Sequence, residues 1–325
     1  MVFENTIGID VSKETIDVHN HLTGAKKEFT NNNAGFKQLI KWSDPTGKLI
    51  FCFEHTGMYS LPLAVFLSTS KQPFAMVPGL EVKRSLGLVR GKNDRIDAQR
   101  LARYAYLRRE EIAPTTLPSK SINKLKSLLN LRAKMVRQKA GYQATLRELR
   151  TFAKIPKKDI LYASQDKLIE ELNKQIKRVE DEMKDIIKGD KELNRLFSLI
   201  TSVKGVGLIL GTSFLVYTNC FAAFDNWRKF ASYSGIAPFE YQSGSSTRAP
   251  RRVHHFANKG LKALLSNAAT TSIQFNPEMK LYYQRRLQEG KNKMSTINII
   301  RNKIVARVFA TVKRGTPYVQ TLAYA

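Results

Sequence analysis

One segment constrains the fold more than any other. Between Ser119 and Asp190, prolines and glycines are rare and charged residues dominate. Apolar residues recur there at spacings of three or four, which gives an amphipathic helix a narrow apolar seam. The sequence therefore predicts a long α-helical coiled-coil connector, folded as a hairpin that breaks near Ile155 and Pro156. The seam consists of Leu168, Leu172, Ile176, Val179, Met183 and Ile187.

This connector divides the chain into three expected parts, residues 1–118, 119–190 and 191–325. A narrow apolar seam is a surface that pairs helices, so it is expected to join copies of the chain, although closure of the hairpin on itself would bury the same stripe.

The first half of the connector is strongly basic. Residues 119–163 hold twelve lysines and arginines but only two acids, Glu148 and Asp159. The whole 325-residue chain carries a net charge of +27, which is more than solubility requires and favours a polyanionic partner. Contacts to a nucleic-acid backbone are expected from Lys134, Arg137 and Lys139.

The first hundred or so residues alternate between strand and helix patterns. Three short β-branched or alternating segments come first, at residues 5–12, 15–22 and 26–32. A helix at 33–43, an apolar strand at 48–54, a helix at 61–70 and a strand at 73–78 follow. Three strands followed by alternating helix and strand is the order of an α/β ribonuclease-H-like domain.

The last part of the chain, residues 191–325, predicts a mainly α-helical domain. Gly205 and Gly207 are expected between two apolar helical segments, either in an ordinary turn or in one whose backbone N–H groups contact a phosphate. Residues 241–325 hold fifteen lysines and arginines against Glu278 and Glu289, so this domain is also expected to face nucleic acid.

Four carboxylates stand out in so basic a chain. Asp10 lies in the first expected strand, where an acid is costly to bury unless it binds something. Glu54 ends the apolar strand 48–54, which lies beside the first strand in a ribonuclease-H-like sheet. Asp94 and Asp97 are three residues apart and share one face of a helix. Together they predict a site for one or two Mg²⁺ or Mn²⁺ ions that serve phosphodiester chemistry.

Each of these residues also has a structural interpretation. Asp94 fits a helix cap or a partner of Arg95 or Arg100, and Asp10 fits a turn at a strand end. His55, beside Glu54, is a ligand or base in one interpretation and a packing or hydrogen-bonding residue in the other.

Residues 238–252, PFEYQSGSSTRAPRR, place small residues directly beside arginines. One interpretation is a nucleophilic serine whose target phosphate is clamped by cations. The other is a flexible, solvated loop, and Ser243, Ser245 and Ser246 are equivalent candidates by composition. The cations expected to contact nucleic acid here are Arg248, Arg251, Arg252 and Lys259. His254 and His255 either contact phosphate or pack.

The sequence resembles the DEDD transposases of the bacterial insertion-sequence 110 family over nearly its whole length. The resemblance lies in GIDVSK, FEHTG and KNDRIDAQRLA, then the charged hairpin, then SVKGVG and YSGIAPFEYQSG, in that order. It implies a RuvC-like N-terminal domain, a coiled-coil connector and a C-terminal transposase domain with a serine nucleophile. It maps the Asp-Glu-Asp-Asp tetrad onto Asp10, Glu54, Asp94 and Asp97, and the serine onto Ser243.

The resemblance also implies the partners. Such enzymes act on double-stranded DNA, at the element ends and the target, and use a guide RNA encoded by their own element. A homo-oligomer, dimer or tetramer, is expected because recombination joins ends of two duplexes. No membrane association is expected, and two cysteines in apolar contexts fit a cytoplasmic protein.

Two other classes of function remain open on the same residues. A metal-dependent nuclease of the junction-resolvase type would use the carboxylates and leave Ser243 incidental. A noncatalytic nucleic-acid-binding protein would use the basic surface alone. The three classes predict different products. A recombinase becomes attached covalently to the cut DNA, a nuclease leaves hydrolysed ends, and a noncatalytic protein leaves neither.

Overall fold

The structure is a computed structural model that describes residues 3–43, 47–85, 94–243, 247–253 and 256–319. Within these ranges, the side chains of residues 94–95, 239–243 and 247–252 are not described. The chain folds into two compact units, which meet in the sequence at Leu117 and Pro118. Each unit has its own hydrophobic core.

The N-terminal unit is built on a five-stranded mixed sheet with the order β3-β2-β1-β4-β5. The strands are β1 (Asn5–Val11), β2 (Thr15–Asn20), β3 (Lys26–Thr30), β4 (Leu49–Glu54) and β5 (Phe74–Val77). The first three strands pair antiparallel, whereas β4 runs parallel to both β1 and β5. The sequence prediction of an α/β domain with three leading strands, and of the strand bearing Glu54 beside the first, is confirmed.

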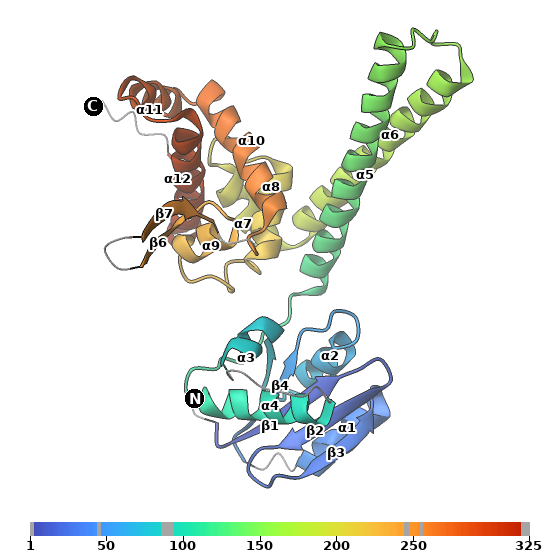
Figure 1. Cartoon of the computed structure of the whole chain (residues 1–325), viewed down its shortest axis with the longest axis vertical. Coiled ribbons are helices and arrows are strands. Elements are labelled where there is room, and N and C mark those ends of the chain that lie inside the picture. The colour runs from blue at the N-terminus through green and yellow to red at the C-terminus, as the bar shows by residue number, and fades with distance from the viewer. Residues whose placement is uncertain (1–2, 44–46, 86–93, 244–246, 254–255, 320–325) are drawn as a thin grey trace. The chain divides into compact units, whose positions relative to one another are not determined.

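Helices cover both faces of this sheet (Figure 1). On one face, α1 (Asn33–Ser43) and α2 (Leu61–Thr69) pack on alternate residues of β1 such as Ile7 and Ile9. On the other face, α4 (Asp94–Leu107) and α3 (Gly79–Ser85) pack on Ile50 and Cys52 of β4. Because strand side chains alternate between the two faces, Thr6, Gly8 and Asp10 belong to the face of α4.

The second unit begins with a long helical hairpin of α5 (Lys120–Thr151) and α6 (Ile160–Gly189). The Ser119 hydroxyl accepts a hydrogen bond from the Ile122 N–H at the start of α5, and the Asp159 carboxylate accepts one from the Leu161 N–H at the start of α6. The break near Ile155 and Pro156 therefore lies where the sequence predicts it.

The buried seam of α6 differs from the predicted one at two positions, because Leu168 is exposed and Leu172 is only half-buried. Ile169 is buried, together with Ile176, Val179, Met183 and Ile187, whereas Leu168 is 46 % exposed. Successive residues of a helix are about 100° apart, so Leu168 lies off the stripe that Ile169, Ile176 and Met183 define.

This seam closes on the chain's own α5. Val179 and Met183 share one core with Ile122 and Leu125 of α5. Most of the predicted seam is therefore buried within the hairpin, which supports the alternative that the hairpin closes on itself.

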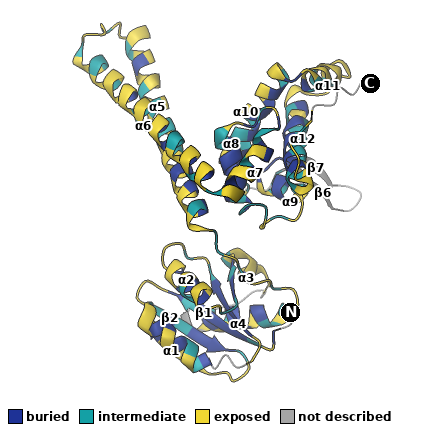
Figure 2. Cartoon of the chain, turned by 180° about the vertical axis from the view of Figure 1, so that it is seen from behind, coloured by how far each residue is buried: buried dark blue, intermediate teal, exposed yellow. Residues whose placement is uncertain are grey.

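The rest of the second unit is mainly helical. The helices are α7 (Lys191–Thr201), α8 (Leu208–Tyr217), α9 (Trp227–Tyr233), α10 (Lys259–Phe275), α11 (Pro277–Gln288) and α12 (Lys293–Arg314). Figure 2 shows their buried residues gathered between α7, α8 and α12, while the far end of the hairpin is mostly exposed. No helix of the described chain is both long and apolar enough to cross a membrane.

The turn between α7 and α8 contains the two predicted glycines. Gly205 has φ of +93°, and a Cβ there would lie 2.2 Å from the Ser272 hydroxyl oxygen of α10. Gly207 is the N-cap of α8 and contributes no side-chain hydrogen bond. Close packing against α10 accounts for Gly205, whereas a Cβ on Gly207 would meet no described atom within 4 Å.

Candidate active site

Two of the four predicted carboxylates lie next to each other on neighbouring strands. Ile9 of β1 pairs with Phe53 of β4, and Asp10 and Glu54 are the next residues along these parallel strands. The pleat directs both side chains to the face of the sheet that α4 covers. Both residues are half-buried, as expected for groups at a strand end that a ligand can still reach.

The third carboxylate, Asp97, is positioned by the close approach of α4 to the sheet. A Cβ on Gly8 would lie 2.1 Å from the Ala98 carbonyl oxygen and 2.2 Å from the Ala102 nitrogen. The Thr6 hydroxyl also donates a hydrogen bond of 2.8 Å to the Ala102 carbonyl oxygen. The first turn of α4, which carries Asp97, therefore lies over β1 near Asp10.

Asp97 forms an ion pair with Arg100, with 2.7 Å between Oδ1 and Nη1. Asp94 is the first residue of α4, but its side chain lies outside the described residues. Within the described part of the chain, no three histidine, cysteine or acidic side chains form a metal-binding group. Carboxylate oxygens of Asp10 and Glu54 are the donors that Mg²⁺ and Mn²⁺ prefer, so the pair fits part of such a site.

The strand register reveals further acids that sequence reasoning missed. Asp17 of β2 lies directly opposite Asp10, and Glu28 of β3 lies opposite Asp17. Together with Glu54, they form a transverse row of acids across four neighbouring strands. The signal was present in the sequence, because the triplet Ile-Asp-Val occurs at both 9–11 and 16–18 and a hairpin between the copies aligns the two aspartates.

The surroundings of Glu54 restrict its carboxylate. A Cβ on Gly79, the first residue of α3, would lie 2.4 Å from Glu54 Oε2, so a larger residue there would displace the carboxylate from its present position. His55 Nδ1 accepts a hydrogen bond of 3.1 Å from the Gly57 N–H, which supports the hydrogen-bonding interpretation of this residue. Burial, with the charges of Glu54 and Glu81, raises the pKa of the Cys52 thiol to about 12, which excludes it as a thiolate nucleophile.

We predict that Gly8→Ala destabilises the N-terminal unit. The new methyl group meets backbone atoms of α4, which cannot rotate away, so the helix must move off the sheet. Overpacking of this kind costs about 1–3 kcal/mol, or a midpoint of thermal unfolding lower by roughly 5–15 °C. Differential scanning calorimetry measures this, with Gly47→Ala as the control because nothing lies within 4 Å of a Cβ there. An unchanged midpoint for Gly8→Ala would contradict the close contact.

Ser243 lies at the end of a strand that pairs with a second strand, while residues 244–246 between them lie outside the described residues. β6 (Phe239–Ser243) pairs antiparallel with β7 (Thr247–Arg252), and Ser243 lies opposite Thr247. Ser243 is therefore the last residue of β6, beside the turn. Arg248, Arg251 and Arg252 belong to β7, but the side chains of these arginines and of Ser243 lie outside the described residues.

The base of this hairpin is fixed by three helices. The Asn258 N–H donates a hydrogen bond of 2.9 Å to the Tyr233 carbonyl oxygen, so the end of α9 and the start of α10 meet. Gly235 has φ of +68°, and a Cβ there would lie 2.7 Å from Ala257 Cβ. A helix-bound base leaves the serine at the opposite end of the hairpin, where it can meet a large substrate.

The third helix at this base is α12. The side-chain amides of Asn298 and Asn302 donate hydrogen bonds of 2.8 and 3.0 Å to the carbonyl oxygen of Ile236, three residues before β6. Sequence reasoning missed both asparagines, because their partner is a backbone atom more than sixty residues away. Lys259, an expected nucleic-acid contact, is the exposed first residue of α10. His254 and His255 lie outside the described residues, as do Ser245 and Ser246.

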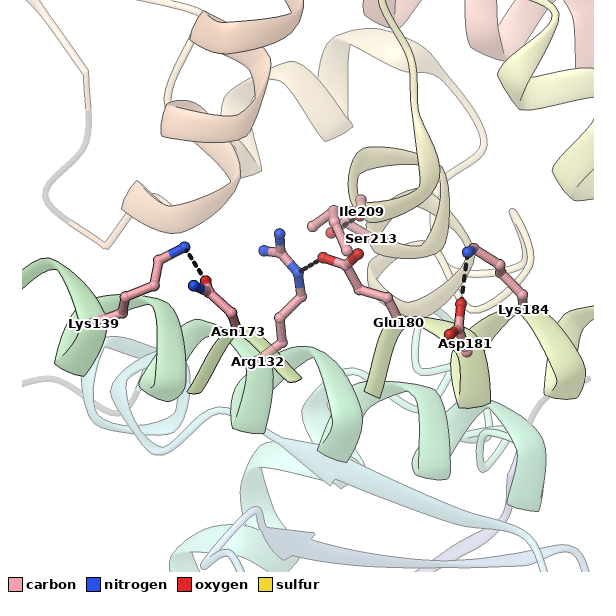
Figure 3. A network of polar contacts seen from close by, with 8 residues as sticks. All are labelled: Arg132, Lys139, Asn173, Glu180, Asp181, Lys184, Ile209 and Ser213. Carbon is pink, nitrogen blue, oxygen red and sulfur yellow. Dashed lines mark hydrogen bonds and ion pairs between the residues drawn. The ribbon is translucent and has the colours of Figure 1, made fainter. Parts of the chain in front are cut away.

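The basic connector residues lie on α5 in two different settings. Lys134 and Arg137 are exposed, whereas Lys139 is half-buried and its ammonium donates to Asn173 Oδ1 of α6 at 3.0 Å. Figure 3 shows this bond beside the ion pair of Arg132 with Glu180, which also joins α5 to α6. The exposed side chains of Lys134 and Arg137 can therefore contact a partner. The Lys139 side chain instead joins α5 to α6.

Comparisons with known proteins agree along most of the chain. A transposase family model of the DEDD, IS110 type matches residues 7–152, and a model described as the transposase IS116/IS110/IS902 family matches residues 185–284. The pilin gene-inverting protein of Moraxella bovis is 29 % identical over 324 residues, which cover 96 % of this chain and 97 % of that protein.

Proteins of insertion elements are also similar. A 44.8 kDa protein of insertion element IS116 from Streptomyces clavuligerus is 22 % identical over 329 residues, covering 80 % of this chain and 81 % of the relative. A 43.6 kDa protein of insertion element IS110 from Streptomyces coelicolor is 28 % identical over 130 residues, or 39 % of this chain and 31 % of the relative.

These matches identify the chain as a DNA transposase, an enzyme that rearranges DNA by strand cleavage and joining. The α/β unit with paired acids at its strand ends and the long basic hairpin agree with this class. More particularly, residues 7–152 and 185–284 match the two domain models of the IS110-type transposases, and the Moraxella bovis relative named above carries the same resemblance along most of the chain.

Proposed function

We propose that this chain is an RNA-guided, site-specific DNA recombinase of an insertion sequence, which cuts and rejoins DNA through a covalent phosphoserine at Ser243. The observation that carries the proposal is the position of Ser243 at the turn end of a hairpin whose base is anchored on α9, α10 and α12. The name of the Moraxella bovis relative describes inversion of a pilin gene, and inversion likewise requires cut strands to be rejoined without loss.

In the proposed first step, the Ser243 hydroxyl oxygen attacks phosphorus in the DNA backbone. A bond forms between Oγ and phosphorus as the serine hydroxyl gives up its proton, the bond from phosphorus to one deoxyribose oxygen breaks, and that oxygen takes up a proton and leaves as a hydroxyl. A hydroxyl of the second strand then attacks the phosphoserine, and Ser243 is released with its proton restored. The phosphoester is conserved throughout, so exchange needs no external energy. Arg248, Arg251 and Arg252 on β7 would stabilise the negative charge on the phosphate.

We further propose that the N-terminal unit is RNase-H-like, specifically RuvC-like. The strand order β3-β2-β1-β4-β5, with acids on β1 and β4 and at the start of α4, supports this. Asp10, Glu54, Asp94 and Asp97 would hold Mg²⁺ or Mn²⁺, which when bound supplies charge stabilisation at the reacting oxygens. The hydrogen bond from Thr6 to Ala102 and the close approach of α4 at Gly8 support this, because they pack the helix that carries Asp94 and Asp97 against β1.

The parts of the proposed enzyme follow the predicted division of the chain. Residues 1–118 would supply the carboxylates, residues 119–190 would bind nucleic acid, and residues 191–325 would present the serine. The proposed partners are double-stranded DNA, at the element ends and target, and a guide RNA from the same element. The proposed assembly is a homo-oligomer, a dimer or tetramer, in the cytoplasm.

Neutralising the connector tests the nucleic-acid partner. We predict that Lys134→Gln, Arg137→Gln and Lys139→Gln together lower the affinity for the element-encoded RNA and flatten its dependence on salt. Each lost phosphate contact reduces the slope of log affinity against log salt by roughly 0.7–0.9. Filter binding across a salt series measures the slope, and Lys174→Gln and Lys177→Gln on α6 serve as exposed controls. An unchanged slope in the triple variant would contradict a role in RNA binding.

The proposed function is tested by stopping a cleavage reaction with detergent and separating the DNA under denaturing conditions. The mixture contains the protein, DNA with both element ends, the element-encoded RNA and Mg²⁺. We expect DNA that migrates with protein and is released by protease. Cut DNA with free ends would instead show a hydrolytic nuclease, and intact DNA with full binding would show a noncatalytic protein.

A further inference from the structure

Arg301 of α12 is a buried cation without an acidic partner in the described part of the chain. The residue is 6 % exposed. Its Nη1 donates a hydrogen bond of 3.2 Å to Asn298 Oδ1, while its Nε has no hydrogen-bond partner among the residues whose side chains are described. Burial lowers the pKa of the guanidinium, although not enough to discharge an arginine at neutral pH.

Other arginines of the same domain differ in this respect. Arg307, which lies on the same helix, is paired with Glu278, and Arg286 is paired with Glu289. Burying a charge costs free energy unless the charge is paired, and a buried arginine is normally paired with a carboxylate. Arg301 has one neutral amide oxygen instead, so its cost is not offset within the described protein.

The position of Arg301 connects it to the serine hairpin. Asn298, which accepts its hydrogen bond, is one of the two asparagines whose amides hold the carbonyl oxygen of Ile236 at the base of the hairpin. The other asparagine, Asn302, directly follows Arg301 on α12. The guanidinium is therefore one side chain away from the segment that leads into β6.

We propose that Arg301 is a phosphate-binding residue, and that a backbone phosphate of the DNA strand engaged by the serine hairpin is its missing partner. This proposal rests on the proposed function, because it assumes that the hairpin engages DNA. A guanidinium matches the oxygens of a phosphate with two parallel hydrogen bonds, and Nε is one of the donors used in such pairs. With 6 % of the residue exposed, little water remains to be removed when the phosphate arrives.

The test replaces Arg301 by methionine, which keeps most of the length and removes the charge. We expect Arg301→Met to raise the thermal midpoint of the protein alone, because an unpaired buried charge is removed. We expect it to weaken binding of a double-stranded oligonucleotide carrying the element end roughly 10- to 100-fold, the effect of losing hydrogen bonds to a charged group. Fluorescence anisotropy measures binding, in the Ser243→Ala background so that cleavage cannot interfere.

Arg307→Met is the matched control on the same helix. It should lower the midpoint, because Glu278 loses its partner, and leave the affinity for the oligonucleotide unchanged. A lower midpoint for Arg301→Met with unchanged affinity would show a structural role and overturn the proposal. Weaker binding of the guide RNA with unchanged binding of the duplex would also overturn it, since the phosphate would then belong to RNA.

Failure of the proposed function has a different signature. If Ser243→Ala still cuts DNA, the serine chemistry fails, while the affinities of the Arg301 and Arg307 variants still decide whether Arg301 binds phosphate. Arg301→Lys adds a further check, because a lysine keeps the charge but not the two parallel donors. We expect its affinity for the oligonucleotide to lie between those of the wild type and Arg301→Met. We expect its thermal midpoint not to rise as that of Arg301→Met does.

Discussion

Asp10→Asn and Glu54→Gln are each expected to reduce DNA strand cleavage at least about 100-fold while leaving nucleic-acid binding within about twofold of wild type. Each change removes a carboxylate charge and keeps the size of the side chain, so the sheet should fold as before. The basic surfaces proposed to bind DNA and RNA are elsewhere in the sequence and keep their charge. Cleavage of a labelled duplex and binding in excess chelator measure the two effects separately.

Glu110→Gln is the control for this pair, since Glu110 is an exposed acid of the same unit beyond the end of α4. It should cut DNA at the wild-type rate. Chelation should reproduce the effect of Asp10→Asn in the wild-type protein, and added Mg²⁺ or Mn²⁺ should reverse it. Wild-type cleavage in chelator, or full cleavage by either variant, would refute the metal site.

The N-terminal fold could be predicted because its signals are local. Alternation in residues 5–12 and 15–22 indicates half-buried strands, and the continuous apolar run at 48–54 is typical of a buried parallel strand. Register was harder to predict, because it depends on pairing between strands. Asp17 was missed for this reason, although it lies directly opposite Asp10.

The connector shows where a periodic pattern is ambiguous. Leu168 and Ile169 are both apolar, and a window that begins at Leu168 fits helical spacing nearly as well as one that begins at Ile169. Contact with α5 decides the phase, and Ile169 is the residue that it buries. The same contact decides that the seam closes the hairpin, which sequence alone left open.

The serine hairpin depends on contacts that a sequence cannot display. Glycine, serine and proline in residues 238–252 are as typical of a loop as of a hairpin. The hairpin is held by Asn298, Asn302 and Asn258, which lie far from β6 in the sequence or act on backbone atoms. The burial of Arg301 could likewise not be predicted, because the sequence of a basic helix does not show which of its cations is buried.

Ser243→Ala is expected to abolish both cleavage and the covalent adduct, by roughly 10³-fold or more, and to retain DNA binding. The substitution removes only the hydroxyl oxygen, and alanine is tolerated at the end of a strand. Ser245→Ala and Ser246→Ala are the matched controls, because they change a serine of the same segment and should retain recombination. A Ser243→Ala protein that still cuts DNA would make the chain a hydrolytic nuclease acting through its carboxylates.

The most direct measurement of the central claim is the identity of the residue that carries the DNA. The detergent-stopped adduct is digested with nuclease and protease, and the modified peptide is sequenced by mass spectrometry. The account predicts a nucleotide attached through phosphate to Ser243, in the peptide that contains Tyr241 and Gln242. Attachment to any other residue, or an adduct of equal yield from the Ser243→Ala protein, would contradict it.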